Sequence, residues 1–308
     1  MANAEKERIL QELKSRFGQI QKMPGSDSLF LIGEGAARVY FRYSKVHPRK
    51  RSFFGLRQVD LRHLEGQNSY ICLAVSGGTE PVFLPYADFE EVFHRARAAA
   101  DGQYKVMLLT EPNGRELYVA RQGRFNVEGY VGLEPLARGI DTERLRSARE
   151  FSHDQVQTLL AGIGNAKGYD VWVPDNNVRC LDWSLTLPFQ VSKSLPERFR
   201  DIRNILCEID VVWLARGGNQ IEGLYEVEHS TPIYSGLLRF NDVLLTDSGI
   251  HRFSIVSNDS RREIFSQQLF RPTFRRSGLA ELCSFLEYAN VYSWHERMIG
   301  GRSDGKTE

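Results

Sequence analysis

Apolar residues recur along this chain with two different periods, and the switches between them mark the expected elements. In the N-terminal part, short apolar runs of strand character are bounded by turn residues. Residues 3–16 and 87–100 instead carry apolar residues at helical spacing. This mixture predicts a compact α+β domain over residues 1–135, a recognition or regulatory module. Its expected strands are 29–32, 38–43, 70–75, 81–84, 104–109 and 116–120.

A glycine-rich and then charged stretch separates this domain from the rest of the chain. Three glycines and a proline fall within 129–139, and a charged run occupies 141–150. Because such clusters are typical of loops, we interpret residues 136–150 as a connector. A second domain is then expected over residues 151–308.

The second domain opens with a strong helix signal. Ser152 and Gln155 have the spacing of a capping box, and the apolar residues that follow recur every three or four positions. Downstream, short apolar runs alternate with helical patterns. The expected order is helix, strand, helix, two strands, helix, strand and two helices. Their ranges are 154–164, 169–173, 196–205, 209–214, 224–231, 233–245, 253–257, 263–269 and 279–289.

Two neighbouring strands of this domain carry three carboxylates. Asp210 lies on the first strand, and Glu226 and Glu228 lie on the second. Since side chains alternate faces along a strand, Glu226 and Glu228 point to the same side. Three carboxylates on one face repel one another and favour a hard cation such as Mg²⁺, which prefers oxygen ligands. The sequence therefore predicts a metal site suited to phosphodiester chemistry.

With these residues in place, the second domain resembles the PD-(D/E)XK nuclease superfamily, the restriction-endonuclease-like fold. The resemblance covers residues 150–290 and depends on the order of elements and on two segments, IDVVWL at 209–214 and EVEHSTPIYSGLLR at 226–239. It implies an α/β fold, α+β overall, with a C-terminal core of central mixed sheet flanked by helices beside the N-terminal α+β domain. It also implies hydrolysis of phosphodiester bonds by metal-activated water, with Mg²⁺ as the ion and Mn²⁺ as its substitute.

The resemblance assigns a role to each carboxylate. Asp210 matches the metal-binding aspartate of the superfamily and Glu226 its second acidic ligand, so these two residues would hold the metal. Glu228 stands where lysine is usual, which makes this an E-x-E variant, and Ile209 stands where the motif has proline. A glutamate in the third position would act as general base or hold a second cation. Pro174-Asp175 matches the first letters of the motif but is more simply a turn.

Candidate contacts to nucleic acid lie in both domains. The net charge is only +1, so the distribution of charge is more informative than its sum. Aromatic residues alternate with basic ones in one segment of the first domain, a pattern suited to stacking on bases and contacting phosphates. The second domain has basic residues shortly after the carboxylate strands. The candidates are Arg42, Lys45, Arg49, Lys50 and Arg51 in the first domain, and Arg239, Arg261 and Arg262 in the second.

The composition narrows the cellular setting. The four cysteines of this 308-residue chain are scattered and form no CxxC pair, which favours reduced thiols and argues against a zinc knuckle. There is no run of eighteen apolar residues and no apolar leader at the N-terminus, so we expect a cytoplasmic protein without membrane contact.

Together these features predict a metal-dependent, restriction-type DNA endonuclease acting on double-stranded DNA. A homodimer is expected on symmetry grounds, because cutting both strands of a duplex often uses two active sites. Two alternatives remain open. One is a catalytically silent nucleic-acid-binding protein of the same fold, and the other is an RNA-directed or repair nuclease.

Overall fold

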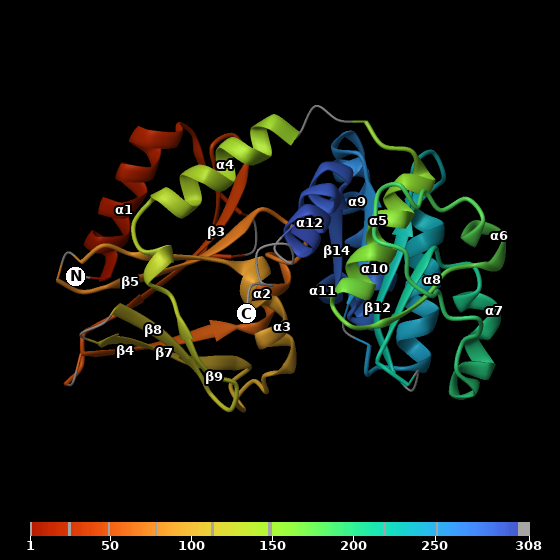
Figure 1. Cartoon of the computed structure of the whole chain (residues 1–308), viewed down its shortest axis with the longest axis horizontal. Helices are drawn as coiled ribbons and strands as arrows, with labels where there is room; N and C mark the ends of the chain where they lie inside the picture. The colour runs from red at the N-terminus through yellow and green to blue at the C-terminus, as the bar shows by residue number, and fades with distance from the viewer. Residues whose placement is uncertain are drawn as a thin grey trace. The chain divides into compact units, whose positions relative to one another are not determined.

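The computed structural model divides the chain into two compact units, Met1–Ala148 and Arg149–Glu308 (Figure 1). It describes residues 2–23, 26–48, 50–77, 79–111, 114–146, 150–217, 220–250 and 252–300. The observed boundary lies near the end of the expected connector.

Most of the expected connector is a helix rather than a loop. Helix α4 spans Glu134–Arg146, and its buried Leu136 and Ile140 belong to a core cluster of the first unit. The glycine within it has a packing role. A Cβ atom on Gly139 would lie 1.7 Å from the hydroxyl oxygen of Tyr70, so only glycine lets the helix approach the sheet this closely.

The first unit contains two separate sheets. In the first sheet the order is β1-β2-β3-β5-β6, with β3 and β5 parallel and the other neighbours antiparallel. The second is antiparallel, in the order β4-β7-β8-β9. The strands are β1 (Ile20–Lys22), β2 (Leu29–Ile32), β3 (Ala37–Ser44), β4 (Arg51–Arg57), β5 (Ser69–Val75), β6 (Val82–Pro85), β7 (Gln103–Glu111), β8 (Gly114–Val119) and β9 (Gly123–Asn126). The other helices of this unit are α1 (Ala2–Phe17), α2 (Gln58–Arg62), α3 (Tyr86–Arg95) and the 3₁₀ turn η1 (Glu128–Tyr130).

The second unit is built around one five-stranded sheet in the order β10-β11-β12-β13-β14. The strands β10, β11 and β12 form an antiparallel meander, and β13 and β14 add parallel to β12. The strands are β10 (Asp170–Trp172), β11 (Val211–Leu214), β12 (Ile221–Val227), β13 (Phe253–Ser257) and β14 (Cys283–Glu287). The helices are α5 (His153–Ala166), α6 (Asp175–Val178), η2 (Glu197–Ile202), α7 (Arg203–Leu206), α8 (Ile233–Thr246), η3 (Asp259–Arg261), α9 (Arg262–Leu269), α10 (Pro272–Ser277), α11 (Leu279–Leu282) and α12 (Tyr288–Gly300).

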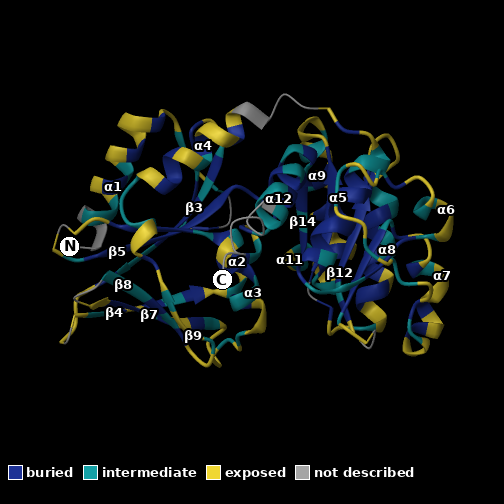
Figure 2. Cartoon of the chain, viewed as in Figure 1, coloured by how far each residue is buried: buried dark blue, intermediate teal, exposed yellow. Residues whose placement is uncertain are grey.

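Both faces of this sheet are covered, because successive residues of each strand enter different cores. Val211 and Trp213 pack with α5 and α12, whereas Val212 and Leu214 pack with α8 and its neighbours. The strands β11 and β13 are therefore buried at every residue, and the other strands of this sheet are mostly buried (Figure 2). Such double burial explains their continuous apolar runs.

The last predicted helix, 279–289, is wrong. Only Leu279–Leu282 is helical, and Cys283–Glu287 forms β14, the parallel edge strand beside β13. Leu279, Leu282 and Leu286 recur at a spacing that also fits a helix, so the period alone could not distinguish the two structures.

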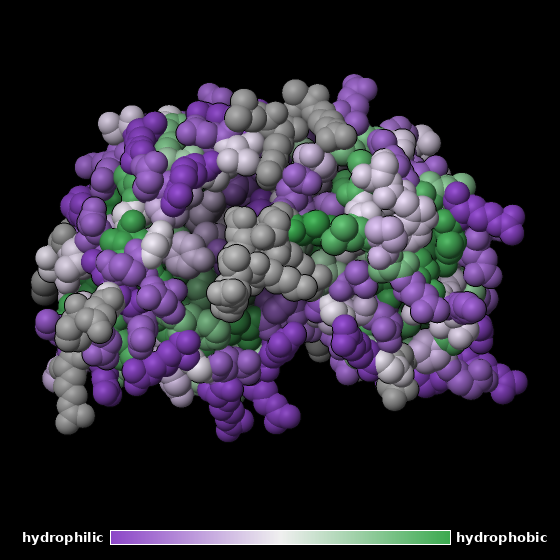
Figure 3. Space-filling model, in the orientation of Figure 1, coloured by the Kyte–Doolittle hydropathy of each residue, from purple (hydrophilic) through white to green (hydrophobic). Residues whose placement is uncertain are grey.

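The outer surface of each unit is largely hydrophilic on the face seen in Figure 3, with smaller apolar areas. Among the described residues, no helix is both long and apolar enough to span a bilayer.

Close packing at one tryptophan connects α5 to the sheet. The indole Nε1 of Trp213 donates to the carbonyl oxygen of Leu160 at 3.1 Å, and its ring lies against Tyr225. Gly164 lies one turn after Leu160, and a Cβ there would be 2.5 Å from the Trp213 Nε1. Gly164 is therefore needed for the contact between helix and sheet.

We expect Gly164→Ala to destabilise the second unit by about 1–3 kcal/mol, because the added methyl group overpacks the core. The direction of the change in stability is informative, since alanine normally stabilises a helix interior relative to glycine. All four tryptophans lie in the second unit, so urea unfolding followed by tryptophan fluorescence measures this unit. The control is Asn165→Ala in the same helix, which removes atoms instead of adding them. A Gly164→Ala protein as stable as the wild type would contradict the packing argument.

Candidate active site

The three carboxylates lie where the meander meets α8. Asp210 immediately precedes β11, Glu226 is the penultimate residue of β12, and Glu228 follows that strand. Glu226 and Glu228 are 1% and 2% exposed, and the side chain of Asp210 is 15% exposed. Buried carboxylates are unusual unless a positive group or hydrogen bonds compensate them.

Arg239 supplies that positive charge from α8. Its Nε lies 2.6 Å from Glu226 Oε1, and its Nη2 lies 3.9 Å from Glu228 Oε1. Gly236, three residues earlier, permits this approach, since a Cβ there would be 2.9 Å from Glu228 Oε1. The sequence predicted that Arg239 contacts a phosphate, and here it holds the two glutamates together.

The environment of these glutamates favours their protonated forms. Burial raises the pKa of Glu226 to about 8, against the attraction of Arg239 and with added repulsion from Asp210 and Glu228. Burial also raises the pKa of Glu228, although the Thr231 hydroxyl donates to its carboxylate and counteracts part of that rise. Fully ionised, the three carboxylates would carry more negative charge than Arg239 balances, and Glu226 therefore holds a proton near neutral pH.

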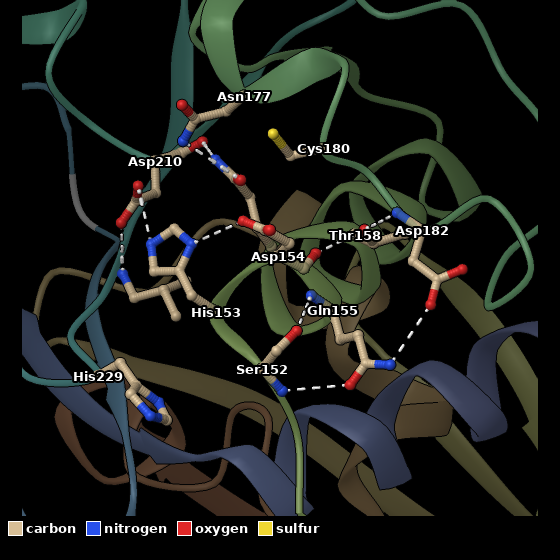
Figure 4. Close-up of polar contacts among 12 residues, drawn as sticks. Ser152, His153, Asp154, Gln155, Thr158, Asn177, Cys180, Asp182, Asp210 and His229 are labelled. Carbon is tan, nitrogen blue, oxygen red and sulfur yellow. Dashed lines mark hydrogen bonds and ion pairs between the residues drawn. The ribbon is translucent and has the colours of Figure 1, made fainter.

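Asp210 is held from several directions (Figure 4). Its Oδ2 accepts from the backbone N–H of Val227 at 2.8 Å, which joins it to the strand between the two glutamates. Its Oδ1 lies 3.3 Å from His153 Nε2, and its backbone carbonyl accepts from Gln157 Nε2 at 2.8 Å. The hydrogen bond to Asp210 raises the pKa of His153, despite an opposing effect of burial.

Sequence reasoning did not single out His153 or Gln157. Both lie on α5, whose start at Ser152 the capping box located correctly. The available signal was their i, i+4 spacing, which places both on one face of the helix. Nothing in the sequence indicated that this face meets Asp210.

Two arginines beyond β13 contact protein groups. Arg261 donates to the carbonyl oxygens of Glu228 at 2.7 Å and Thr231 at 2.5 Å, and so braces the segment after β12. Arg262 pairs with Asp259 and Glu287. Both guanidinium groups therefore have partners within the protein.

Most of the basic segment of the first unit is strand. Arg42 lies in β3 with its guanidinium over the ring of Tyr40, and Arg51 begins β4. Lys45 and Lys50 are exposed between these strands. Phe53, on β4, has 53% of its surface exposed. Arg49 lies outside the described residues.

The carboxylate cluster fits a divalent cation in its chemistry but not in its present arrangement. Its oxygen donors and surplus negative charge suit a hard cation. In the part of the chain that the structure describes, however, no three His, Cys, Asp or Glu residues are grouped as metal ligands. The guanidinium of Arg239 instead lies against both glutamates. Metal ligation through Glu226 Oε1 would thus require Arg239 to move away from that oxygen.

Two comparisons relate this chain to known proteins. The model of a family described as the type II restriction enzyme NmeDI C-terminal domain matches residues 136–299, more than half of the chain. The type II restriction enzyme NmeDI of Neisseria meningitidis serogroup C is 28% identical over 132 residues. That alignment covers 40% of this chain and 37% of the relative, so little more than a third of the relative's length is represented. The family match includes all three carboxylates.

The raised pKa of Glu226 predicts a pH dependence of stability. In the unfolded chain a glutamate has a pKa of about 4.3, whereas in the folded protein the pKa of Glu226 is about 8. The folded state therefore binds more protons in this range, and this contribution to stability is lost as the pH rises. Glu226→Gln keeps an oxygen for Arg239 but removes the titration, so it should gain stability relative to the wild type between pH 5 and 9.

The gain should be on the order of a few kcal/mol, since one pKa unit corresponds to about 1.4 kcal/mol. Denaturant unfolding at each pH measures it, and Glu222→Gln on the same strand controls for removal of a nearby carboxylate. A difference between Glu226→Gln and the wild type that stays constant with pH would contradict the prediction.

Proposed function

This chain belongs, through residues 136–299, to the family of the type II restriction enzyme NmeDI C-terminal domain, and from this premise we propose that it is a restriction-type DNA endonuclease. Its substrate is double-stranded DNA, and its reaction is hydrolysis of phosphodiester bonds. The observation that carries the proposal is the cluster of the half-buried Asp210 with the buried Glu226 and Glu228 within the matched region.

The arrangement of elements supports the PD-(D/E)XK assignment. A helix, an antiparallel three-strand meander, a crossover helix and a parallel fourth strand follow one another as α5, β10–β12, α8 and β13. The crossover connects two parallel strands, as such a helix must. Asp210 and Glu226 lie at neighbouring ends of adjacent strands, where this assignment expects the two acidic ligands.

The residues that would hold Mg²⁺, or Mn²⁺ in its place, are Asp210 and Glu226. A bound ion of this kind polarises the scissile phosphate and lowers the pKa of water. Glu228, whose burial raises its pKa, is suited to accept a proton from the attacking water. Arg239, released from Glu226, would carry its charge to a phosphate oxygen.

A catalytically silent binding protein is the second candidate function. The observation that favours it is the ion pair between Arg239 and Glu226. In this pair the guanidinium, and not a metal ion, neutralises the charge of the proposed metal ligand Glu226. The E-x-E sequence, without the usual lysine, fits this reading as well. The two candidates differ in whether a metal ion displaces Arg239.

Cleavage of supercoiled plasmid and of modified phage DNA distinguishes them. We expect cleavage with Mg²⁺, none with EDTA, and a loss of at least about 100-fold in Glu226→Gln, which lacks the charge to hold a cation. Glu222→Gln, a half-buried glutamate of the same strand, should cleave like the wild type.

Cleavage that persists in EDTA or in Glu226→Gln would overturn the metal-dependent mechanism. Tight DNA binding by the wild type without cleavage of any DNA tested would establish the silent binding protein instead. Sedimentation of the complex with a duplex tests the proposed homodimer, and fractionation of the source cells tests the proposed cytoplasmic location.

The basic residues of the first unit give a separate prediction for DNA binding. Lys45→Gln should weaken duplex binding, and the slope of log affinity against log salt should fall in magnitude by about 1, because one phosphate contact is lost. Lys14→Gln removes the same charge from an exposed position of helix α1 and is the control. Fluorescence anisotropy at several salt concentrations measures both variants, and equal slopes would exclude Lys45 as a phosphate contact.

A further inference from the structure

The carboxylate of Asp210 is oriented by two groups from different elements. Val227 N–H donates to Oδ2 from β12, and His153 Nε2 lies 3.3 Å from Oδ1. Each carboxylate oxygen has a second lone-pair direction that these contacts leave available. Asp210 is therefore fixed in direction while retaining capacity to bind a further group.

Helix α5 reaches Asp210 with two side chains one turn apart. Gln157 donates to the backbone carbonyl of Asp210. His153 contacts the carboxylate of Asp210, as Figure 4 shows. Residues at i and i+4 share a helix face, so both contacts follow from one placement of α5. The helix thus holds the backbone and the side chain of Asp210 together.

Hydrogen bonds also fix the position of the first turn of α5. The Ser152 side chain accepts from the Gln155 N–H, and the Gln155 side chain accepts from the Ser152 N–H, which completes the capping box. Gln155 also donates to Asp182, whose own N–H donates to Thr158. His153 is therefore the first residue of a helix end that is fixed by four hydrogen bonds.

The imidazole is anchored on its second nitrogen as well. His153 Nδ1 lies 3.4 Å from Asp154 Oδ1, so the ring bridges two carboxylates. The His153 side chain remains 32% exposed, and α5 therefore presents it at the surface of the site. A ring held at both nitrogens has a defined orientation and can transmit that orientation to Asp210.

We propose that His153 is a positioning residue of the active site, which fixes the Asp210 carboxylate for metal binding. The inference depends on the proposed nuclease function, because Asp210 is a ligand only there. Hydrogen-bond partners of metal ligands typically change metal affinity by about 10–100-fold when they are removed. His153 would thus be a residue that α5 contributes to the site in addition to the three carboxylates.

Binding of Mn²⁺ to the full chain, followed through the free Mn²⁺ signal in electron paramagnetic resonance, tests this without DNA. We expect His153→Ala to weaken Mn²⁺ binding by about 10-fold or more. His153→Gln should restore most of the affinity, since its amide N–H reaches about as far as the imidazole Nε2. The matched control is His229→Ala, because His229 lies beside Glu228 in sequence but stacks on Tyr288. Unfolding curves establish that each variant is folded.

The kinetics of DNA cleavage provide a second test of this proposal. His153→Ala should lower kcat with little change in KM for DNA, because it acts on the ligand and not on substrate binding. Mn²⁺ affinity in His153→Ala equal to or above that of the wild type would overturn the proposal. Equal loss in His153→Ala and His153→Gln would overturn the hydrogen-bonding role. Wild-type protein that binds no Mn²⁺, or binds it equally after Glu226→Gln, would overturn the proposed metal site and the role of His153 with it.

Discussion

The burial of Glu226 and Glu228 at the end of β12 is the constraint on which the rest of this site depends. Two carboxylates two residues apart share a sheet face, and α8 covers that face, so neither side chain can turn to solvent. Removing such groups from water is costly unless charge and hydrogen bonds compensate. The surrounding elements are placed to supply that compensation.

Each neighbouring element compensates the buried carboxylates in a different way. Helix α8 approaches closely through Gly236 and extends Arg239 to Glu226. The segment after β13 braces the backbone of Glu228 through Arg261. On the opposite side, α5 and β12 together orient Asp210. The fold therefore stabilises a concentration of negative charge that a simpler packing of the same elements would avoid, which is typical of functional sites.

Much of this fold could be predicted because its elements have clear periods. The strand expected at 29–32 is β2 itself, and the helices expected at 154–164 and 233–245 are α5 and α8 within two residues at each end. Where two periods fit one segment, as in Cys283–Glu287, prediction was wrong. The strand Arg51–Arg57 was missed for another reason, since its buried Ser52 and exposed Phe53 break the alternation of apolar and polar residues.

The candidate site was predictable only in part, for a physical reason. Asp210, Glu226 and Glu228 could be found from strand alternation, which is a local property. The partners that set their charge, Arg239 and His153, come from helices whose faces meet the strands only in three dimensions. Arg239 was expected to contact a phosphate because it follows the carboxylate strands, and no sequence period indicated its ion pair with Glu226. Electrostatic balance at this site is therefore a property of the assembled unit and not of any segment.

On the proposed PD-(D/E)XK assignment, glutamate at the third position of the motif would change that balance by two charges relative to lysine. In an E-x-K site, the lysine offsets one of the two carboxylates. Here Glu228 adds a third carboxylate, and Arg239 supplies one positive charge through its ion pair with Glu226. The remaining excess is reflected in the pKa of Glu226, which burial and its acidic neighbours raise to about 8. A cluster of this kind can take up a proton or, as proposed here, a cation, and the two would compete for the same carboxylate. On the proposed PD-(D/E)XK assignment, glutamate in place of lysine would increase the electrostatic demand for a metal ion, and Arg239 would meet part of that demand.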